Sequence, residues 1–532
     1  MRGFHLTSAV ATIGLCLSAP VQAQQTETID AARTAASQDR NRDAGDLYAQ
    51  AIREDPSLRG ALLREYADQL TFSDRSRGAV PLYREVLERG DLAASERSLA
   101  MRGLALALAW SGQHRDAVAA YSDLLEIDRE DRDARVMRGK VLLWSRKYSA
   151  AIRDFKQALA RHPSDTEALR ALAEAQSLAG YQRDALATLA RLPQNIDADD
   201  LRFLGRTQLW SGRPNAARDS LAQVMAMQPN DPAALSLLRE SERATKPLSE
   251  ISVRHSDQSD ASDFWQVSGW QSIWPSEAVM LSVGYDGFYF DPADPALTVD
   301  VHRPAVAARA RVSDSVELNG QLGITFTNSL QTDRERMTWN VWGTFAPSDR
   351  LRFDTGFNRS TLDNARSNQL GIYADTFSWS ADIGSDAAWK LSARVAHSDF
   401  SDGNDRDWGQ VELRRRVGRR PNLFLGARYT HFTFDEQRDN GYFDPDRLRA
   451  LEFTTQAWGR LGAFWYDLRG AIGREDQRGG DGRTIYSAEA RLTYDASRSW
   501  QVEGYINSFS SRTEALGGFS RTTTGLTLRT RW

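Results

Sequence analysis

The stretch VELNGQLGITF, residues 316–326, alternates apolar and polar side chains along its length. Its even positions include Val316 and Leu322, and its odd positions include Glu317 and Gln321. This period of two predicts a β-strand with one apolar face and one polar face. About sixteen segments of similar length follow the same rule between residues 247 and 532, each long enough to be a tilted membrane strand.

The connections between these segments alternate in length. Short links such as 313–315 and 346–350 are followed by long polar links such as 291–300, 398–407 and 435–447. A soluble β-sandwich shows the same alternation within strands, so the strands alone leave that alternative open. Short turns at one end and long loops at the other are typical of a transmembrane β-barrel. We therefore predict an antiparallel barrel of about 16 strands over residues 246–532.

Aromatic and apolar residues also fit a barrel in an outer membrane. Many tryptophans lie near segment ends, for example Trp389 and Trp500, as expected for the two membrane interfaces. The chain ends on an aromatic residue behind alternating leucines, which fits the signal that barrel-assembly machinery recognises. These residues are Leu526, Leu528 and Trp532.

The polar positions of the alternation define the expected lumen. If the apolar positions face lipid, the charged positions must face water inside the barrel. Arginines, carboxylates and flat rings together suit a sugar polymer, whose hydroxyls bond to polar groups while its C–H faces stack on rings. The alternative is a network of ion pairs that braces the wall. The predicted lumen and polymer-contact residues are Trp270, Asp286, Arg309, Arg311, Trp342, Arg352, Asp354, Arg394, Glu412, Arg414, Arg416, Arg428, Glu452, Trp465, Arg469 and Tyr505.

Residues 24–245 carry a different pattern, an internal repeat. Equivalent alanines are spaced by 35, 38, 34, 34 and 32 residues, and a bulky apolar residue follows each alanine by four positions. Small residues allow two antiparallel helices to approach, and proline ends the second helix. The residues expected to carry this packing include Ala117, Tyr121, Ala151, Phe155, Pro163 and Ala217. We predict an α-helical solenoid of about six tetratricopeptide-like repeats, whose concave face holds a partner. A generic helical bundle and a rigid spacer without a ligand are the alternatives.

The N-terminal segment, residues 1–23, has Arg2 before a short apolar run and small residues before Ala23. This pattern predicts a secretory signal peptide, with a retained anchor as the alternative. The only cysteine, Cys16, lies in this segment, so the predicted mature chain contains no disulfide and no thiolate metal site.

Neither charge nor motifs indicate an enzyme. The formal net charge of −4 gives no indication of nucleic-acid binding. The histidines are scattered, and the chain contains no HExxH, nucleophile elbow or phosphate loop. Asp399, Asp402, Asp405 and Asp407 could hold a divalent cation, but we interpret them as a solvated loop. No catalytic residue, metal or cofactor is expected.

The order of signal peptide, tetratricopeptide repeats and carboxy-terminal barrel resembles the outer-membrane exporters of exopolysaccharides, such as those for cellulose and poly-N-acetylglucosamine. The stretch GYFDPDRLRA, residues 441–450, is similar to one seen in barrels of this group. The resemblance implies that the barrel conducts polymer across the outer membrane. It also implies that the repeats bind polysaccharide synthesis or modification proteins in the periplasm. The chain departs from the group in being short, without a deacetylase or hydrolase domain.

Three functions remain to be compared. An export pore would hold the exopolysaccharide in its lumen through weak, repeated contacts, and the excess of arginine favours an anionic polymer. A scaffold or surface receptor would use the barrel only as an anchor in outer-membrane lipid. A small-solute porin leaves the repeats unexplained.

Overall fold

The structure, a computed structural model, describes residues 26–193, 197–259, 262–292, 298–329, 333–384, 388–438, 440–477, 482–510 and 520–532. The expected signal peptide, residues 1–23, lies outside these ranges. The chain divides into two compact units, residues 1–178 with 187–194 and residues 179–186 with 195–532. Each unit is described separately below.

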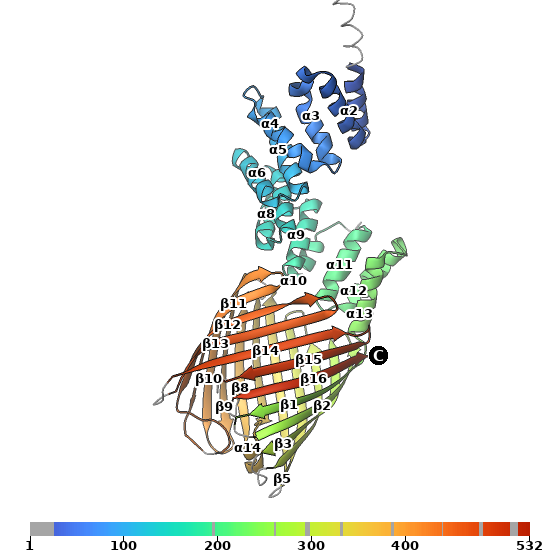
Figure 1. Ribbon diagram of the computed structural model, residues 1–532. Helices are drawn as coiled ribbons and strands as arrows, with labels where there is room; N and C mark the ends of the chain where they lie inside the picture. Colours follow the sequence, from blue (N-terminus) through green and yellow to red (C-terminus); the bar gives the residue numbers. More distant parts are fainter. Residues whose placement is uncertain are drawn as a thin grey trace, which may run out of the picture. The chain divides into compact units, whose positions relative to one another are not determined.

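The first unit consists of helices packed in sequence order. After helical residues 26–37 come α2 (Asn41–Glu54), the 3-10 turn η1 (Pro56–Leu58), α3 (Arg59–Phe72), α4 (Ser76–Glu88), α5 (Ala94–Trp110), α6 (His114–Ile127), α7 (Arg132–Trp144), α8 (Tyr148–Arg161) and α9 (Thr166–Leu178). Each of α2 to α8 contacts the next helix along the chain, as in a solenoid of helix pairs. The predicted tetratricopeptide-like solenoid is therefore confirmed (Figure 1).

Small residues are found where helices of one repeat come closest. A Cβ added at Gly139 would lie 2.5 Å from the Phe155 ring, so the aromatic side chain rests directly on the facing helix. Gly205 receives Leu221 in the same way in the second unit. The expected packing residues Ala117, Tyr121, Ala151, Phe155 and Ala217 are buried, whereas Pro163 is exposed and follows the end of α8.

The second unit contains the remaining helices and the barrel. Its helices are the first part of α10 (Gln182–Leu189), α11 (Ala198–Trp210), α12 (Pro214–Met227) and α13 (Pro232–Ala244). The strands are β1 (Leu248–Gln258), β2 (Ser262–Ser276), β3 (Val279–Pro292), β4 (Val299–Arg311), β5 (Val316–Ser329), β6 (Arg334–Ser348), β7 (Leu351–Thr361), β8 (Tyr373–Ile383), β9 (Trp389–Phe400), β10 (Asp405–Arg419), β11 (Asn422–Phe434), β12 (Leu448–Leu461), β13 (Phe464–Gln477), β14 (Arg483–Asp495), β15 (Trp500–Phe509) and β16 (Arg521–Arg531).

These strands form one closed antiparallel barrel in which every strand pairs with its sequence neighbours. Pairing of β1 with β16, from Leu248 opposite Arg531 to Gln258 opposite Arg521, closes the ring. Figure 1 shows β16, in red, beside β1, in green. The predicted barrel of 16 strands is confirmed.

Alternation along each strand places apolar side chains on the outside. On β9, Leu391 and Val395 are exposed on the outer face, while Arg394 and Ser392 belong to the opposite face. At the carboxy-terminal strand, Leu526 and Leu528 are exposed outward, and the Trp532 indole nitrogen donates to Ser249 Oγ at 3.0 Å. A closed barrel with an apolar outer belt is an outer-membrane type of structure. Among the helices that the structure describes, none is long and apolar enough to cross a membrane.

The two ends of the barrel differ, and we call them the turn end and the loop end. The turn end carries short links such as 349–350 and 462–463, and the loop end carries longer links such as 435–447. The link predicted over residues 398–407 is shorter in the structure, because β9 continues to Phe400 and β10 already begins at Asp405. The link 362–372 was not singled out from the sequence, and it contains a helix, α14 (Ala365–Leu370).

Candidate functional site

Charged side chains on the inward face of β10 to β16 and β1 are joined in a network. Arg428 donates two hydrogen bonds to Glu452, at 2.8 and 2.9 Å, and the Glu452 side chain is buried. Further along the wall, Arg469 pairs with Asp467 at 2.8 Å and Arg529 pairs with Glu503 at 3.0 Å. This part of the wall matches the bracing alternative, because most of its cations already have anionic partners.

Polar side chains of neighbouring strands extend the network. Glu412 accepts from Thr454 at 2.9 Å, and Arg414 donates to Gln456 at 3.0 Å. The Arg416 guanidinium lies 5.0 Å from the centre of the Phe424 ring.

A pocket on the inner wall of β6 to β10 combines rings and polar groups. It has a volume of about 480 Å³, and Trp342, Trp408 and Arg394 line it together with Asn340 and Asp354. Among the described residues, the Arg394 side chain forms no ion pair or hydrogen bond. Two indoles beside an unpaired guanidinium can stack on a sugar ring and bind its oxygens.

The other predicted lumen residues are distributed over the inward face. Trp270 and Asp286 are neighbours, with 3.5 Å between the indole nitrogen and Oδ1. Tyr505 lies between Arg254 and Arg491, whose guanidinium carbons are 5.7 and 5.1 Å from the ring centre. The remaining residues lie apart from these pairs. Arg352 donates to Asp354, and Trp465 lies beside Arg460 at the turn end. Arg309, on β4, has no ion pair in the described part of the chain.

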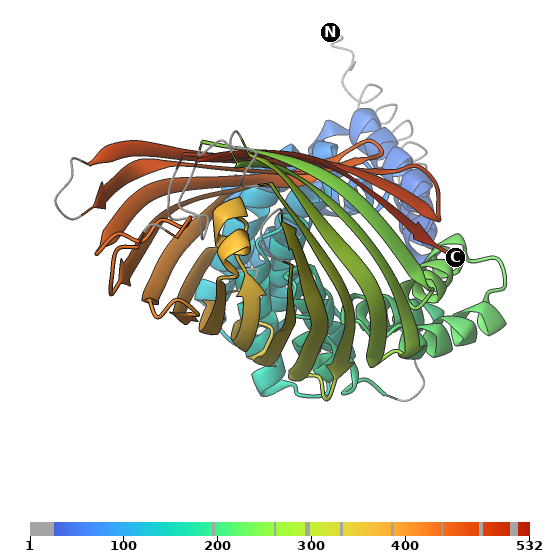
Figure 2. The same cartoon turned by 90° about the horizontal axis from the view of Figure 1, so that it is seen from below.

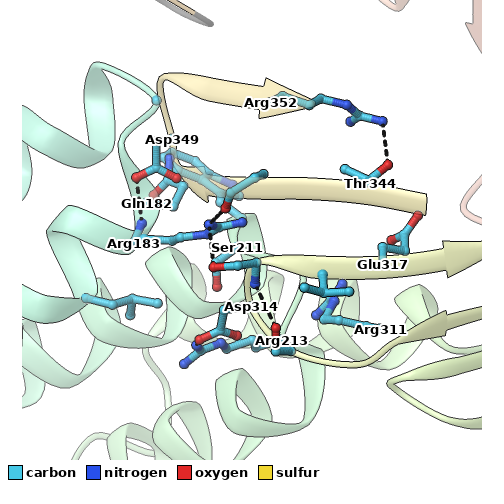
Figure 3. A pocket seen from close by; sticks show the side chains of 17 residues that line it. Gln182, Arg183, Ser211, Arg213, Arg311, Asp314, Glu317, Thr344, Asp349 and Arg352 are labelled. Carbon is cyan, nitrogen blue, oxygen red and sulfur yellow. Dashed lines mark hydrogen bonds and ion pairs between the residues drawn. The ribbon is translucent and has the colours of Figure 1, made fainter. Parts of the chain in front are cut away.

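A second pocket lies at the turn end, between the barrel turns and the helices of the same unit. Its volume is about 360 Å³, and Figure 3 shows its charged lining. Arg183 donates to the Ala346 carbonyl oxygen, Arg213 pairs with Asp314, and Arg311 donates to the Gly212 carbonyl oxygen. These contacts tie α10 and the α11–α12 turn to the ends of β4 and β6 and to the β4–β5 turn. We call this the mouth pocket.

Asp349, in the β6–β7 turn, caps the first turn of α10. Its Oδ2 accepts hydrogen bonds from the backbone N–H groups of Arg183 and Asp184, at 3.0 and 3.3 Å. Burial raises the pKa of the Asp349 carboxyl, although these two hydrogen bonds act in the opposite direction. The carboxylate of Glu277 serves α12 in a similar way, accepting from Asn215 N at 2.9 Å.

At the loop end, the β7–β8 link folds into the barrel. Figure 2, in which the barrel is seen from this end, shows the orange α14 within the ring of strands. Ala365 packs into a buried cluster with inward rings of β2 and β3, including Phe264, Phe288 and Phe290. Helix α14 contacts β4 and β5, although the link that carries it joins β7 to β8. The link therefore crosses part of the lumen. We call residues 362–372 the plug.

Hydrogen bonds fix the conformation of the plug. The Asn364 side chain accepts from Ser367 N at 3.1 Å, and Gly371 ends α14 with a φ of +75°. The buried Asn368 amide donates to the carbonyl oxygens of Leu362 and Asn364, at 2.6 and 2.8 Å.

The β11–β12 link holds the plug from the other side. Ser367 Oγ donates to the Asn440 carbonyl oxygen at 2.8 Å. Leu362 and Ile372 join a buried cluster that includes Phe400, Phe434 and Tyr442. Tyr442 lies in the stretch 441–450 that resembles exporters, and here it packs beside the plug.

The four aspartates of the expected acidic loop separate into two groups. Asp402 accepts from the Tyr442 hydroxyl at 2.7 Å and is part of the loop-end packing. The others gather around His397 on the exposed outer face, where His397 Nδ1 is 2.8 Å from Asp407. Potential ligand atoms of His397, Asp399 and Asp405 lie within 4.8 Å of one another, a grouping that the scattered histidines of the sequence did not suggest.

Two functional features escaped prediction from the sequence. Trp408 was missed because it directly follows a stretch interpreted as a loop. The plug was missed although its sequence LDNARSNQLG carries a capping asparagine and a closing glycine. Those signals mark a short helix, but they do not reveal that the helix lies inside a barrel.

Comparisons with known proteins give fold-level matches. No protein-family model matches the chain, and no match was found among curated proteins. A bacterial polysaccharide outer membrane secretin aligns with 54% of this chain and 99% of its own, at 12% identity and a TM-score of 0.44. PilW, a widely conserved type IV pilus biogenesis factor, aligns with 40% of this chain and 98% of its own, at 19% identity and a TM-score of 0.35.

A third structure, CdiB from Acinetobacter baumannii, aligns with 53% of this chain and 60% of its own, at 8% identity and a TM-score of 0.36. All three TM-scores are below 0.5. The class of protein, an outer-membrane β-barrel preceded by tetratricopeptide-like repeats, therefore rests on the strand pairing and the helix repeats of this chain.

Proposed function

We propose that this chain is an outer-membrane pore that exports an exopolysaccharide, and that its helical repeats bind synthesis or modification proteins in the periplasm. Short turns of such barrels face the periplasm, so the turn end and the mouth pocket are the side of polymer entry. Residues 1–23 would direct the chain to that compartment.

The observation that carries this proposal is the inner pocket of β6 to β10. Trp342 and Trp408 offer flat apolar faces, and Arg394 offers donors that no other described side chain uses. A polymer that slides must meet such groups weakly and repeatedly, since one tight site would stop it. The paired charges of β10 to β16 keep the opposite wall hydrated without holding the polymer strongly.

Export through this lumen requires the plug to move. The plug is attached by hydrogen bonds and by two apolar clusters, both formed with links or strand ends at the loop end. We propose that polymer arriving from the turn end displaces it, and that the unloaded pore is closed.

The plug also favours a second candidate function. A barrel that stays closed would serve only as a membrane anchor, and the protein would then be an envelope scaffold or a surface receptor. Planar-bilayer conductance separates the two functions. The protein is measured intact and with residues 363–371 replaced by a short Gly-Ser linker.

For an export pore, the intact protein conducts rarely and the plug-deleted protein conducts steadily, with block by oligosaccharides added at the turn end. Arg394→Ala weakens that block. Arg415→Ala, which removes an arginine that lies beside Trp389 on the outer face of β10, is the matched control and leaves the block nearly unchanged. A plug-deleted protein without conductance supports the scaffold.

A further inference from the structure

A short motif recurs at the end of the first helix of successive repeats and is not explained by the barrel. Helices α3, α5, α7 and α11 end on Phe72, Trp110, Trp144 and Trp210, and a serine follows each of these rings. In α9 the same place is taken by Leu178.

The turn after each ring has one conformation throughout. The second residue beyond the ring has a positive φ in every case: Asp74 at 60°, Gly112 at 80°, Arg146 at 58° and Gly212 at 75°. Asp74 and Arg146 adopt this conformation without being glycine, so the turn is kept where its usual residue is absent. Each ring is therefore presented in the same way by its repeat.

Core packing does not account for these rings. Phe72, Trp110 and Trp144 are 52%, 48% and 45% exposed, whereas the aromatic residues of the second helices, such as Phe155, are fully buried. Within the first unit the exposed rings follow one another. The Phe72 and Trp110 ring centres are 5.7 Å apart, and His114, at the start of α6, lies 6.3 Å from Trp144. Phe72 and Trp110 are therefore neighbouring exposed rings, and His114 adds a second ring beside Trp144.

The member of this series in the second unit shows what the motif faces there. Trp210 and Ser211 line the mouth pocket, together with Arg213 and Arg311. The motif thus forms part of the turn-end opening through which a polymer would enter the barrel. Because Trp210 of this series lines the mouth pocket, we expect the other rings of the series to bind the same ligand as that pocket.

We propose that Phe72, Trp110 and Trp144 form a binding track for the glycan that the barrel exports, an assignment that rests on the proposed export function. Flat rings that recur from one repeat to the next suit stacking against the C–H faces of sugars, which is also the role proposed for the indoles of the inner pocket. Each ring of the track binds the polymer weakly enough to release it.

The test uses the full-length protein in detergent and measures affinity for hexamers of a uronic acid, of β-linked glucose and of glucosamine. Trp110→Ala/Trp144→Ala should bind the hexamer preferred by the wild type about tenfold more weakly, since two stacking contacts are lost. Trp110→Phe/Trp144→Phe, which keeps flat rings, should retain most of the affinity. Trp110→Leu/Trp144→Leu, which keeps apolar bulk only, should not.

Leu99→Ala/Ile127→Ala is the matched control, because it removes apolar side chains of α5 and α6 that are 49% and 71% exposed. Equal affinity of the Leu, Phe and wild-type proteins overturns the track, as does a wild-type protein that binds none of the hexamers. If the plug-deleted pore is still blocked by a hexamer in that case, the export function stands and only the track is wrong. If no hexamer blocks the pore, the export function itself fails.

Discussion

Gly139 sets the distance between two helices of one repeat. The Phe155 ring occupies the space where a Cβ would be, so any side chain at residue 139 forces the helices apart. We expect Gly139→Ala to lower the free energy of unfolding of the repeats by about 1–3 kcal/mol, as overpacking of a core does. Urea unfolding followed by far-UV circular dichroism measures this. Gly60→Ala is the control, because its Cβ would meet only Arg89 at 3.7 Å, and a comparable loss there would contradict the packing explanation.

Arg132 connects two repeats through carboxylates. It donates to both oxygens of Asp165 at 2.6 Å and to Glu167 at 2.7 Å. The hydrogen bond from Arg132 is the main cause that holds the pKa of Asp165 below its usual range. Because the Arg132 and Glu167 side chains are partly exposed, we expect Arg132→Ala to cost only about 1–2 kcal/mol at pH 7.

The pH dependence of this loss follows from the direction of the shift. A lowered carboxyl pKa gives stability that is complete above the unfolded value of about 3.9 and is lost as pH falls through the folded value. The difference in the free energy of unfolding between wild type and Arg132→Ala should therefore disappear only when the pH falls below the folded-state pKa of Asp165. Arg129→Ala, in the turn just before α7, should leave the pH profile unchanged. A difference that persists at the acid end would contradict the ion-pair assignment.

The inward and outward positions of the barrel were predictable from the sequence, but the partners of the inward charges were not. Predicted lumen residues such as Arg394 and Glu412 alternate with exposed apolar residues, as the period of two requires. Pairing depends on register between strands far apart in the chain, such as Arg529 with Glu250, which meet only because β16 pairs with β1. Such pairs engage inward arginines including Arg428 and Arg529, whereas Arg394 has no ion pair among the residues that the structure describes.

At the scale of elements, the plug depends on a glycine of the neighbouring link. Gly441 has a φ of +88°, and a Cβ there would collide with Asn364 Oδ1 and approach Ser367 N to 3.0 Å. Gly441→Ala should therefore weaken the attachment of the plug and raise the fraction of time that the pore conducts. Single-channel recording measures that fraction. Gly462→Ala is the control, since Gly462 also has a positive φ of 61° but faces open space at the turn end. If both variants open equally often, backbone strain alone explains the effect and the contact between Gly441 and the plug does not.

The attachment of α10 to the barrel is a second contact between elements. Asp349→Ala removes the acceptor for two N–H groups at the start of α10, which costs about 1 kcal/mol in typical helix caps. Hydrogen exchange at Arg183 and Asp184 should become about fivefold to tenfold faster in the variant. Ser348→Ala, whose hydroxyl accepts a hydrogen bond from Arg350 N in the same turn, should leave these two amides unchanged. Unchanged exchange in Asp349→Ala would mean that other contacts hold the helix.

At the scale of the molecule, the sequence predicted both architectures because each repeats a simple period many times. The solenoid and the barrel follow from spacings of about 34 and of two residues, and neither depends on a single residue. The plug and the mouth pocket were not predictable in this way. Each brings together segments that share no pattern, such as Ser367 with Asn440 and Asp349 with Arg183.

The central claim is that the apolar face of the barrel lies in lipid and the charged face lies in water. Because the only cysteine is Cys16, in the expected signal peptide, single cysteines introduced elsewhere can be labelled selectively. Arg394→Cys and Val395→Cys, adjacent on β9, are placed in the plug-deleted protein in liposomes and exposed to a charged, water-soluble thiol reagent. We predict rapid labelling at residue 394 and protection at residue 395. Equal labelling of the two positions, or faster labelling at 395, would contradict the account.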